Sequence, residues 1–268
     1  MKGLHIFDSE ASGLLTEPNL YYHCVLFKEY AQPVFNLFLP PEHDGYEEAI
    51  TWVRTHHSDV EVNIHNIDEL ATWLTTVPAA IACHNAFGYD LPLWKKLSGI
   101  EYDMFRDQKC MGTINDKQVN LYDTLSMSRT LWPDRPLPKG CPESVKNPVT
   151  GRLELVAPHG LMAWGYRVAN KKVKIDDWRN QPLWEYVHRV WEDVIINELV
   201  WKELIDEMQC KGKFEDTAKF LYKDTPYGKQ HKINWKNALR RGMLADYLML
   251  LQERQGVWFD TEAAEKLC

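Results

Sequence analysis

Acidic residues lie within or directly beside apolar segments at three places in this sequence, and the need to bury them constrains the fold. Asp8 and Glu10 come after the apolar residues Leu4, Ile6 and Phe7, a run that predicts the first strand of a domain. Residues two apart on a strand point to the same face. Both carboxylates are therefore expected to reach one site.

Asp90 and Asp193 lie in two further apolar contexts. Asp90 follows a buried-strand pattern at 78–83 and opens an apolar segment with a helical pattern. Strand ends and the helix starts beside them are the usual place for a site in an α/β sheet. Asp193 lies inside a predicted helix, Leu183–Met208, whose apolar residues fall on or near one face. A carboxylate embedded in that pattern is costly to bury without a partner.

Hard divalent cations are suitable partners for these carboxylates. Mg²⁺ prefers oxygen ligands and usually takes one or two carboxylates per ion. The four acidic residues therefore suit two ions, Mg²⁺ or Mn²⁺, as cofactors. Two ions roughly 3.5–4 Å apart activate an attacking water and stabilise the leaving oxygen of a phosphodiester. The pattern predicts hydrolytic phosphoryl transfer, with the following catalytic metal ligands: Asp8, Glu10, Asp90 and Asp193.

Each acidic residue also has a simpler interpretation. Asp-x-Glu at the end of a strand is common in surface turns. Asp90 is a suitable helix N-cap, and Asp193 fits a solvated helix face. The order and the contexts of the four residues together are more specific than any one of them.

Two longer motifs contain the first three acidic residues. They are F-D-S-E-A-S-G-L-L, which begins at Phe7, and C-H-N-A-F-G-Y-D-L-P, which begins at Cys83. Segments 121–129, 159–167 and 251–260 accompany them. Together these segments resemble the DEDD 3′-to-5′ exonucleases, and within them the proofreading domain of family A, DNA polymerase I-like, polymerases. The likeness is strongest to polymerases of short-tailed, T-seven-like bacteriophages, and it covers most of residues 1–205.

The resemblance implies a ribonuclease H-like exonuclease fold. This is an α/β domain with a mixed central sheet flanked by helices, here followed by a C-terminal helical extension. The resemblance also implies that residues in or after the two motifs hold the terminal nucleotides of the strand, namely Leu14, Leu15, Asn85 and Phe87. No segment resembles the palm, fingers or thumb of a polymerase. We therefore expect no polymerisation by this chain alone, and a polymerase domain or subunit as a partner.

The third motif departs from the pattern of its relatives, in which a Tyr stands four residues before the last Asp. Here that position is Arg189, while His188 stands five residues before Asp193, the spacing of the histidine-type branch of the superfamily. A His with a pKa of about 6.5 takes a proton from a metal-bound water, so we predict His188 as a catalytic base. Tyr186 is the competing candidate, but it lies about 10 Å before Asp193 by helical rise. A structural role for His188 is the remaining alternative.

These inferences predict a metal-dependent 3′-to-5′ exonuclease that acts on single-stranded or frayed DNA, primer ends included. It would release nucleoside 5′-monophosphates and serve proofreading. Two alternatives stay open. One is an RNA-trimming exonuclease of the same superfamily, because the choice of substrate depends on contacts to sugar hydroxyls. The other is a catalytically silent exonuclease-like module that binds a primer end or a partner.

Length and composition agree with a compact enzyme. The 268 residues, 45% of them hydrophobic, suffice for one large exonuclease domain, expected at 1–211, and a smaller linker and helical extension at 212–268 that resembles the start of a polymerase domain. The net charge of −7 argues against broad, charge-driven coating of duplex DNA. The six cysteines lack C-x-x-C spacing, which disfavours zinc and a disulfide framework. Without an apolar run of about 18 residues or a signal-peptide pattern, we expect no membrane partner and a cytoplasmic location, in the host cell if a phage encodes the chain.

The remaining patterns predict the order of the elements. Strands are expected at 4–8, 21–28 and 34–39, followed by a helix at 67–75 and, near the end, a helix at 235–255 that packs back on the exonuclease layer. Residues 212–233 are polar and predict a linker. Residues 133–158 contain six prolines and predict an irregular surface excursion, with a DNA-guiding flap as the alternative.

Overall fold

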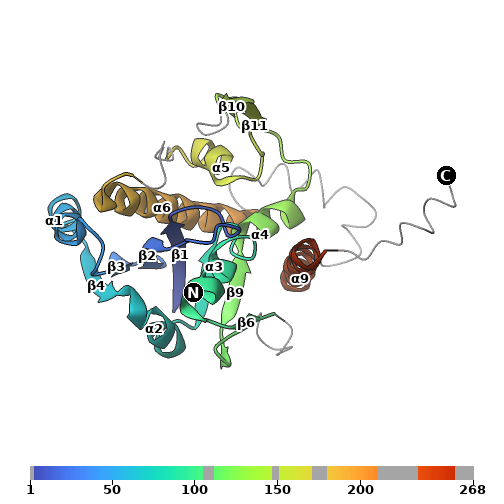
Figure 1. Cartoon of the computed structure of the whole chain (residues 1–268). Helices are drawn as coiled ribbons and strands as arrows, with labels where there is room; N and C mark the ends of the chain where they lie inside the picture. The colour runs from blue at the N-terminus through green and yellow to red at the C-terminus, as the bar shows by residue number, and fades with distance from the viewer. Residues whose placement is uncertain (1–2, 105–111, 147–150, 171–179, 210–234, 257–268) are drawn as a thin grey trace, which may run out of the picture.

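The computed structural model describes residues 3–104, 112–146, 151–170, 180–209 and 235–256 (Figure 1). A six-stranded sheet with the strand order β4-β3-β2-β1-β5-β9 forms its centre. β1 is antiparallel to β2 and parallel to β5, so the sheet is mixed as predicted. The strands are β1 (Leu4–Ala11), β2 (Tyr22–Glu29), β3 (Val34–Leu39), β4 (Glu61–Asn66), β5 (Ala80–Cys83) and β9 (Asn120–Asp123).

Helices cover both faces of this sheet, which gives an α/β architecture compatible with the expected ribonuclease H-like fold. On one face lies the long helix α6 (Leu183–Met208), whose Trp191 stacks on Phe35 of β3 at 4.2 Å between ring centroids. α1 (Tyr46–His56) packs beside α6. On the other face, α2 (Leu70–Thr76) and α3 (Asp90–Ser98) contribute Trp73 and Trp94, which both contact Phe27.

The alternation of side chains along β1 explains which residues face α6. Phe7 points to the α3 face, where its ring lies 4.6 Å from that of Trp94. Since neighbours on a strand alternate, Asp8 and Glu10 point to the opposite face, under α6. The predicted strands and the helices at 67–75, 183–208 and 235–255 are confirmed, within one or two residues at most ends of the elements. α1 and β4 were not predicted.

Shorter elements complete the described part of the chain. α4 (Thr124–Leu131) follows β9, and α5 (Leu161–Arg167) packs on α6. A small three-stranded sheet contains β6 (Tyr102–Asp103), β7 (Thr113–Ile114) and β8 (Lys117–Gln118). The proline-rich excursion is irregular as predicted, except for a hairpin of β10 (Ser144–Lys146) and β11 (Leu153–Leu155). The base of the excursion is fixed to α6, because Arg135 donates two hydrogen bonds of 2.7 Å to Glu207.

The C-terminal helix α9 (Trp235–Gln255) packs against α4, as Figure 1 shows. The prediction that it returns to the exonuclease layer is thereby confirmed. The predicted linker at 212–233, and with it the expected domain boundary at 211, lie outside the described residues. The same holds for the chain after residue 256. No helix in the described ranges is long and apolar enough to cross a membrane.

Candidate metal centre

β1 and α6 together bring three of the four predicted acidic residues into one cluster. Glu10 is buried and Asp8 is half-buried. Asp193 belongs to α6, the helix that covers this face of the sheet, and it is also buried. A carboxylate oxygen of each of these three residues lies within 4.8 Å of those of the other two. Asp193 therefore does not lie on a solvated helix face, and that alternative is wrong.

Arg189 lies in the middle of this cluster. It precedes Asp193 by four residues, so both side chains project from the same face of α6. Its Nε donates a hydrogen bond of 3.0 Å to Oε1 of Glu10 and lies 3.5 Å from Oδ2 of Asp193. Burial alone would lower the pKa of Arg189, but the charges of Asp193, Glu10 and Asp8 raise it above its usual value. The guanidinium is thus a fixed positive charge among the carboxylates.

Asp90 joins the cluster from the other side, together with a residue that was not predicted. Asp90 is the first residue of α3, and the thiol of Cys83 at the end of β5 donates a hydrogen bond of 3.2 Å to its Oδ2. The same sulfur lies 3.9 Å from Oδ1 of Asp8. Asp8, Cys83 and Asp90 form a second group of possible ligands within 4.8 Å, so Asp8 is common to both groups.

The environment of Asp90 separates it from an ordinary capping residue. The N-cap of α3 is Tyr89, and no side chain caps this helix, so the N-cap interpretation of Asp90 is wrong. Asp90 is 2% exposed, and within the described residues its Oδ1 has no hydrogen-bond partner. Burial raises the pKa of Asp90 to about 7, although the hydrogen bond from Cys83 opposes the shift. A buried acceptor of this kind is costly to leave unpaired and fits a bound cation.

The donor set determines which class of cation fits. Burial raises the pKa of Cys83 well above its usual range, so this residue is a neutral thiol and a hydrogen-bond donor. The remaining donors are carboxylate oxygens, which suit hard divalent cations such as Mg²⁺ and Mn²⁺ better than zinc. The residues present therefore fit a divalent metal centre. The spacing of Cys83 to Asp90 within one motif was visible in the sequence, but the approach of Cys83 to Asp8 was not.

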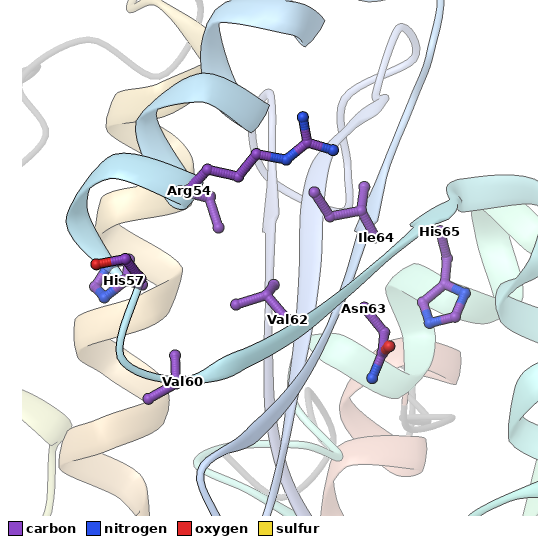
Figure 2. Close-up of a pocket in the computed structure, with 9 residues that line it drawn as sticks. Arg54, His57, Val60, Val62, Asn63, Ile64 and His65 are labelled. Carbon is purple, nitrogen blue, oxygen red and sulfur yellow. The ribbon is translucent and has the colours of Figure 1, made fainter.

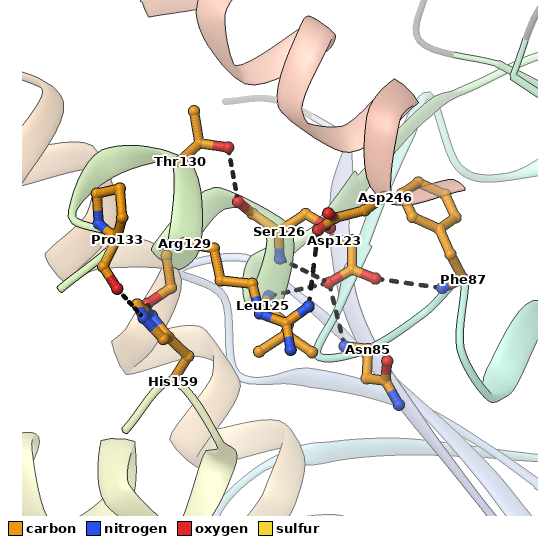
Figure 3. Close-up of polar contacts among 11 residues, drawn as sticks. Asn85, Phe87, Asp123, Leu125, Ser126, Arg129, Thr130, Pro133, His159 and Asp246 are labelled. Carbon is orange, nitrogen blue, oxygen red and sulfur yellow. Dashed lines mark hydrogen bonds and ion pairs between the residues drawn. The ribbon is translucent and has the colours of Figure 1, made fainter. Parts of the chain in front are cut away.

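Asp123 is a further buried carboxylate, for which no role was predicted. It ends β9 and is the N-cap of α4, where its Oδ1 accepts hydrogen bonds from the backbone N–H groups of Leu125 and Ser126. Its two oxygens also accept from the backbone N–H groups of Asn85 and Phe87, both at 3.2 Å (Figure 3). Asp123 thereby holds the loop that leads from Cys83 to Asp90. An Asp before T-L-S at the end of an apolar strand is a recognisable N-cap signal.

Helix α9 contacts the same loop from outside. The ring of Tyr247 lies 5.6 Å from that of Phe87. Arg254 donates hydrogen bonds to the carbonyl oxygens of Phe87 and Gly88, at 2.6 and 3.3 Å. Asp246 accepts a hydrogen bond from Ser126 of α4 (Figure 3). The C-terminal extension therefore stabilises the backbone immediately before Asp90.

The residues predicted to hold the strand end lie in different environments. Leu14 is 68% exposed, whereas Leu15 is partly buried against the core. Asn85 is half-buried and has a left-handed backbone with φ of 68°. Phe87 is 1% exposed and belongs to the core. Of the four, the side chain of Leu14 is the one most open to a ligand.

The predicted base lies on another side of α6. The ring of His188 lies 5.2 Å from that of Trp52 in α1. At about 100° per residue, it is roughly 140° around the helix from Asp193. The competing candidate, Tyr186, stacks on His23 with ring centroids 3.5 Å apart. The structure thus brings Arg189, and not His188, to the carboxylates, and the role of His188 as base stays a prediction that these contacts do not support.

A hollow of about 610 Å³ lies between the end of α1 and β4, and Figure 2 shows its lining. Arg54 and His57 border it on one side, and Val62 and Ile64 on the other. Burial lowers the pKa of His57 to about 4, so this ring is neutral at ordinary pH. None of the lining residues belongs to the carboxylate cluster.

Comparison with known proteins gives one distant relative. No family model matches the chain. The chain is 23% identical, over an alignment of 279 positions, to a DNA-directed DNA polymerase of Enterobacteria phage T3. The alignment covers 98% of this chain but 34% of that polymerase, so the chain spans about a third of the length of the relative it matches.

Proposed function

We propose that this chain is a divalent-metal-dependent 3′-to-5′ exonuclease that hydrolyses phosphodiester bonds at single-stranded or frayed DNA ends. The observation that carries the proposal is the convergence of four acidic residues from β1, α3 and α6, together with the buried Oδ1 of Asp90, which has no hydrogen-bond partner in the described residues. The similarity to a phage DNA polymerase supports DNA as the substrate. The products would be nucleoside 5′-monophosphates.

The proposed roles of the residues follow from their positions. Asp8 belongs to both ligand groups and would help to hold both cations. Asp90 would complete one site, and Glu10 and Asp193 the other. Bound divalent ions supply a water of lowered pKa and neutralise charge that develops on the phosphate. Leu14, exposed beside β1, would contact the terminal nucleotide.

The similarity also supports a wider role. Since the aligned relative is a polymerase about three times as long, we propose that the exonuclease serves proofreading beside a polymerase domain or subunit. The setting would be the cytoplasm of a host cell.

Degradation of 5′-labelled single strands tests the proposal. The protein should shorten single-stranded DNA from its 3′ end with Mg²⁺ or Mn²⁺, and EDTA should stop the reaction. Asp8→Ala should abolish hydrolysis, while Glu42→Ala, which removes an exposed acid, should retain the wild-type rate. Faster degradation of RNA than of DNA would favour the RNA-trimming alternative. Binding of a primer end without cleavage under every metal condition would favour the silent module.

His188→Ala tests the predicted base separately. If His188 takes the proton of the attacking water, the variant should lose roughly 10²–10⁴ in rate with unchanged metal binding. Its packing against Trp52 favours the other outcome, a rate close to that of the wild type.

A further inference from the structure

We infer that Arg189 is an internal cation that occupies the Glu10–Asp193 half of the metal centre and must be displaced before a second divalent ion can bind there. The inference deepens the proposed function and rests on it. It predicts that the two halves of the centre differ strongly in their affinity for metal. The Asp8–Asp90 half would bind first.

The contacts of Arg189 carry the first step. Its side chain is 11% exposed, and those of Glu10 and Asp193 are 7% and 2% exposed. The guanidinium is therefore held out of solvent between two buried carboxylates, at 3.0 Å from one and 3.5 Å from the other. These are two of the three residues whose oxygens lie within 4.8 Å of one another. The positive group and a divalent ion would use the same oxygens.

Charge carries the second step. Arginine stays protonated at every accessible pH, so the group cannot be neutralised to make room for an ion. A divalent cation at these oxygens would meet a like charge at close range in a poorly solvated site, where screening is weak. The ion and the guanidinium therefore exclude each other.

The other half of the centre shows the contrast. Oδ2 of Asp90 accepts a hydrogen bond from the neutral thiol of Cys83. Oδ1 is buried and has no hydrogen-bond partner in the part of the chain that the structure describes. In the described part of the chain no cationic side chain pairs with Asp90, so an ion that binds between Asp8 and Asp90 satisfies this oxygen without displacing a charged partner of Asp90. The two halves therefore differ in charge, because a guanidinium lies beside the carboxylates of Glu10 and Asp193, whereas a neutral thiol lies beside Asp90.

Counting bound Mn²⁺ by electron paramagnetic resonance tests the inference in the absence of nucleic acid. The wild type should bind one ion at least tenfold more tightly than any second ion. Arg189→Gln keeps an amide donor near Glu10 but removes the charge, and it should bind the second ion at least tenfold more tightly than the wild type does. Arg189→Lys keeps the charge and should behave as the wild type. Arg241→Gln, which removes an exposed charge from α9, is the matched control.

The outcomes separate this inference from the proposed function. Identical Mn²⁺ curves for Arg189→Gln and the wild type would overturn the role of Arg189 and leave the exonuclease proposal standing. If neither protein binds Mn²⁺ at all, the proposed function itself fails. If Arg189→Gln does not fold, a nuclear magnetic resonance measurement on the wild type tests the same inference. In the wild type, the ¹⁵Nε–¹H signal of Arg189 should shift with the second equivalent of Mg²⁺ and not with the first, and a shift with the first would overturn the inference.

Discussion

The junctions β5–α3 and β9–α4 each place a buried aspartate where a strand of the sheet leads into a helix. Asp90 and Asp123 are each 2% exposed, and burial raises the pKa of both, to about 7 and about 6. Their hydrogen bonds differ. Asp123 accepts from four backbone N–H groups, whereas Asp90 accepts from the side chains of Cys83 and Ser9, and its Oδ1 has no partner in the described residues. Burial and a perturbed pKa therefore do not distinguish the proposed metal ligand from the structural cap, but the number of backbone N–H groups that each carboxylate accepts from does.

Asparagine substitutions should separate the two residues most clearly in activity. Asp90→Asn removes a proposed ligand, and losing several kcal/mol of charge stabilisation lowers the rate by a factor on the order of 10³ or more. Asp123→Asn leaves the proposed ligands in place and should retain activity within about tenfold of the wild type. Single-turnover hydrolysis of labelled DNA, with Mn²⁺ binding measured alongside, gives both values. A larger loss in Asp123→Asn than in Asp90→Asn would reverse the assignment.

Alanine substitutions should show the opposite order in stability. Asp123→Ala leaves two loop N–H groups and the first turn of α4 without their acceptor, which costs roughly 3–5 kcal/mol of unfolding free energy. Asp90→Ala removes the acceptor of two side chains, Cys83 and Ser9, and leaves no backbone N–H group unpaired, so it should cost less. Urea denaturation at pH 5 in EDTA measures both. Equal losses in the two variants would mean that Asp123 does not organise the loop.

The pH dependence of stability should sharpen the comparison. Below the ordinary carboxyl pKa, Asp123 is protonated in both folded and unfolded chains and has no effect. As the pH rises from about 4 to 6, Asp123 loses its proton in the unfolded chain before it does so in the folded protein. The unfolding free energy therefore falls by up to about 3 kcal/mol over this range. Asp123→Asn should lack this loss. We therefore compare the unfolding free energies of the wild type and of Asp123→Asn in EDTA, and the wild-type value minus the variant value should fall over this pH range. Asp90 titrates in both proteins, so its contribution cancels in this difference. A flat difference would contradict the raised pKa of Asp123.

The smallest effect, a change in the unfolding free energy, is expected for Arg254, which contacts the loop before Asp90 from α9. Asp123 binds the loop N–H groups, and Arg254 of α9 binds the carbonyl oxygens of Phe87 and Gly88. Because Arg254 is exposed and its hydrogen bonds are accessible to water, Arg254→Ala should cost about 1 kcal/mol of unfolding free energy. Thermal unfolding checks this value, with Arg241→Ala on the same helix as the control. A loss as large as that of Asp123→Ala would make α9 the principal support of the loop.

Much of the sheet and the two long helices could be predicted because their apolar patterns are long and regular. α1 was missed because its buried residues, Ala49, Ile50 and Val53, form too short a stripe. β4 was missed because, as an edge strand, it lacks fully buried residues. These elements depend on their tertiary neighbours more than on local pattern.

The candidate site could be predicted only in part. The motifs placed the acidic residues in order along the chain, and at about 100° per residue the spacing already indicates that His188 and Asp193 lie on different sides of a helix. Only the packing of α6 on β1 shows which of these sides meets the carboxylates. His188 and Arg189 are adjacent in sequence, yet one contacts Trp52 and the other contacts Glu10. The role of Cys83 depends on its distance to Asp8, which only the packing of β5 beside β1 determines.

The hydrogen bond between Arg189 and Glu10 joins residues 179 positions apart. Such long-range contacts form late, because the loop between their ends must close before they stabilise the chain. During synthesis, β1 through β9 leave the ribosome before α6 has been translated. Asp8 and Glu10 are therefore made before the helix that completes their cluster. The nascent chain therefore cannot assemble this carboxylate cluster until almost the whole layer has been made. The packing of α6 on β1 brings Asp193 and Arg189 to Glu10 at the same time, so the positive charge is present as soon as the cluster is complete.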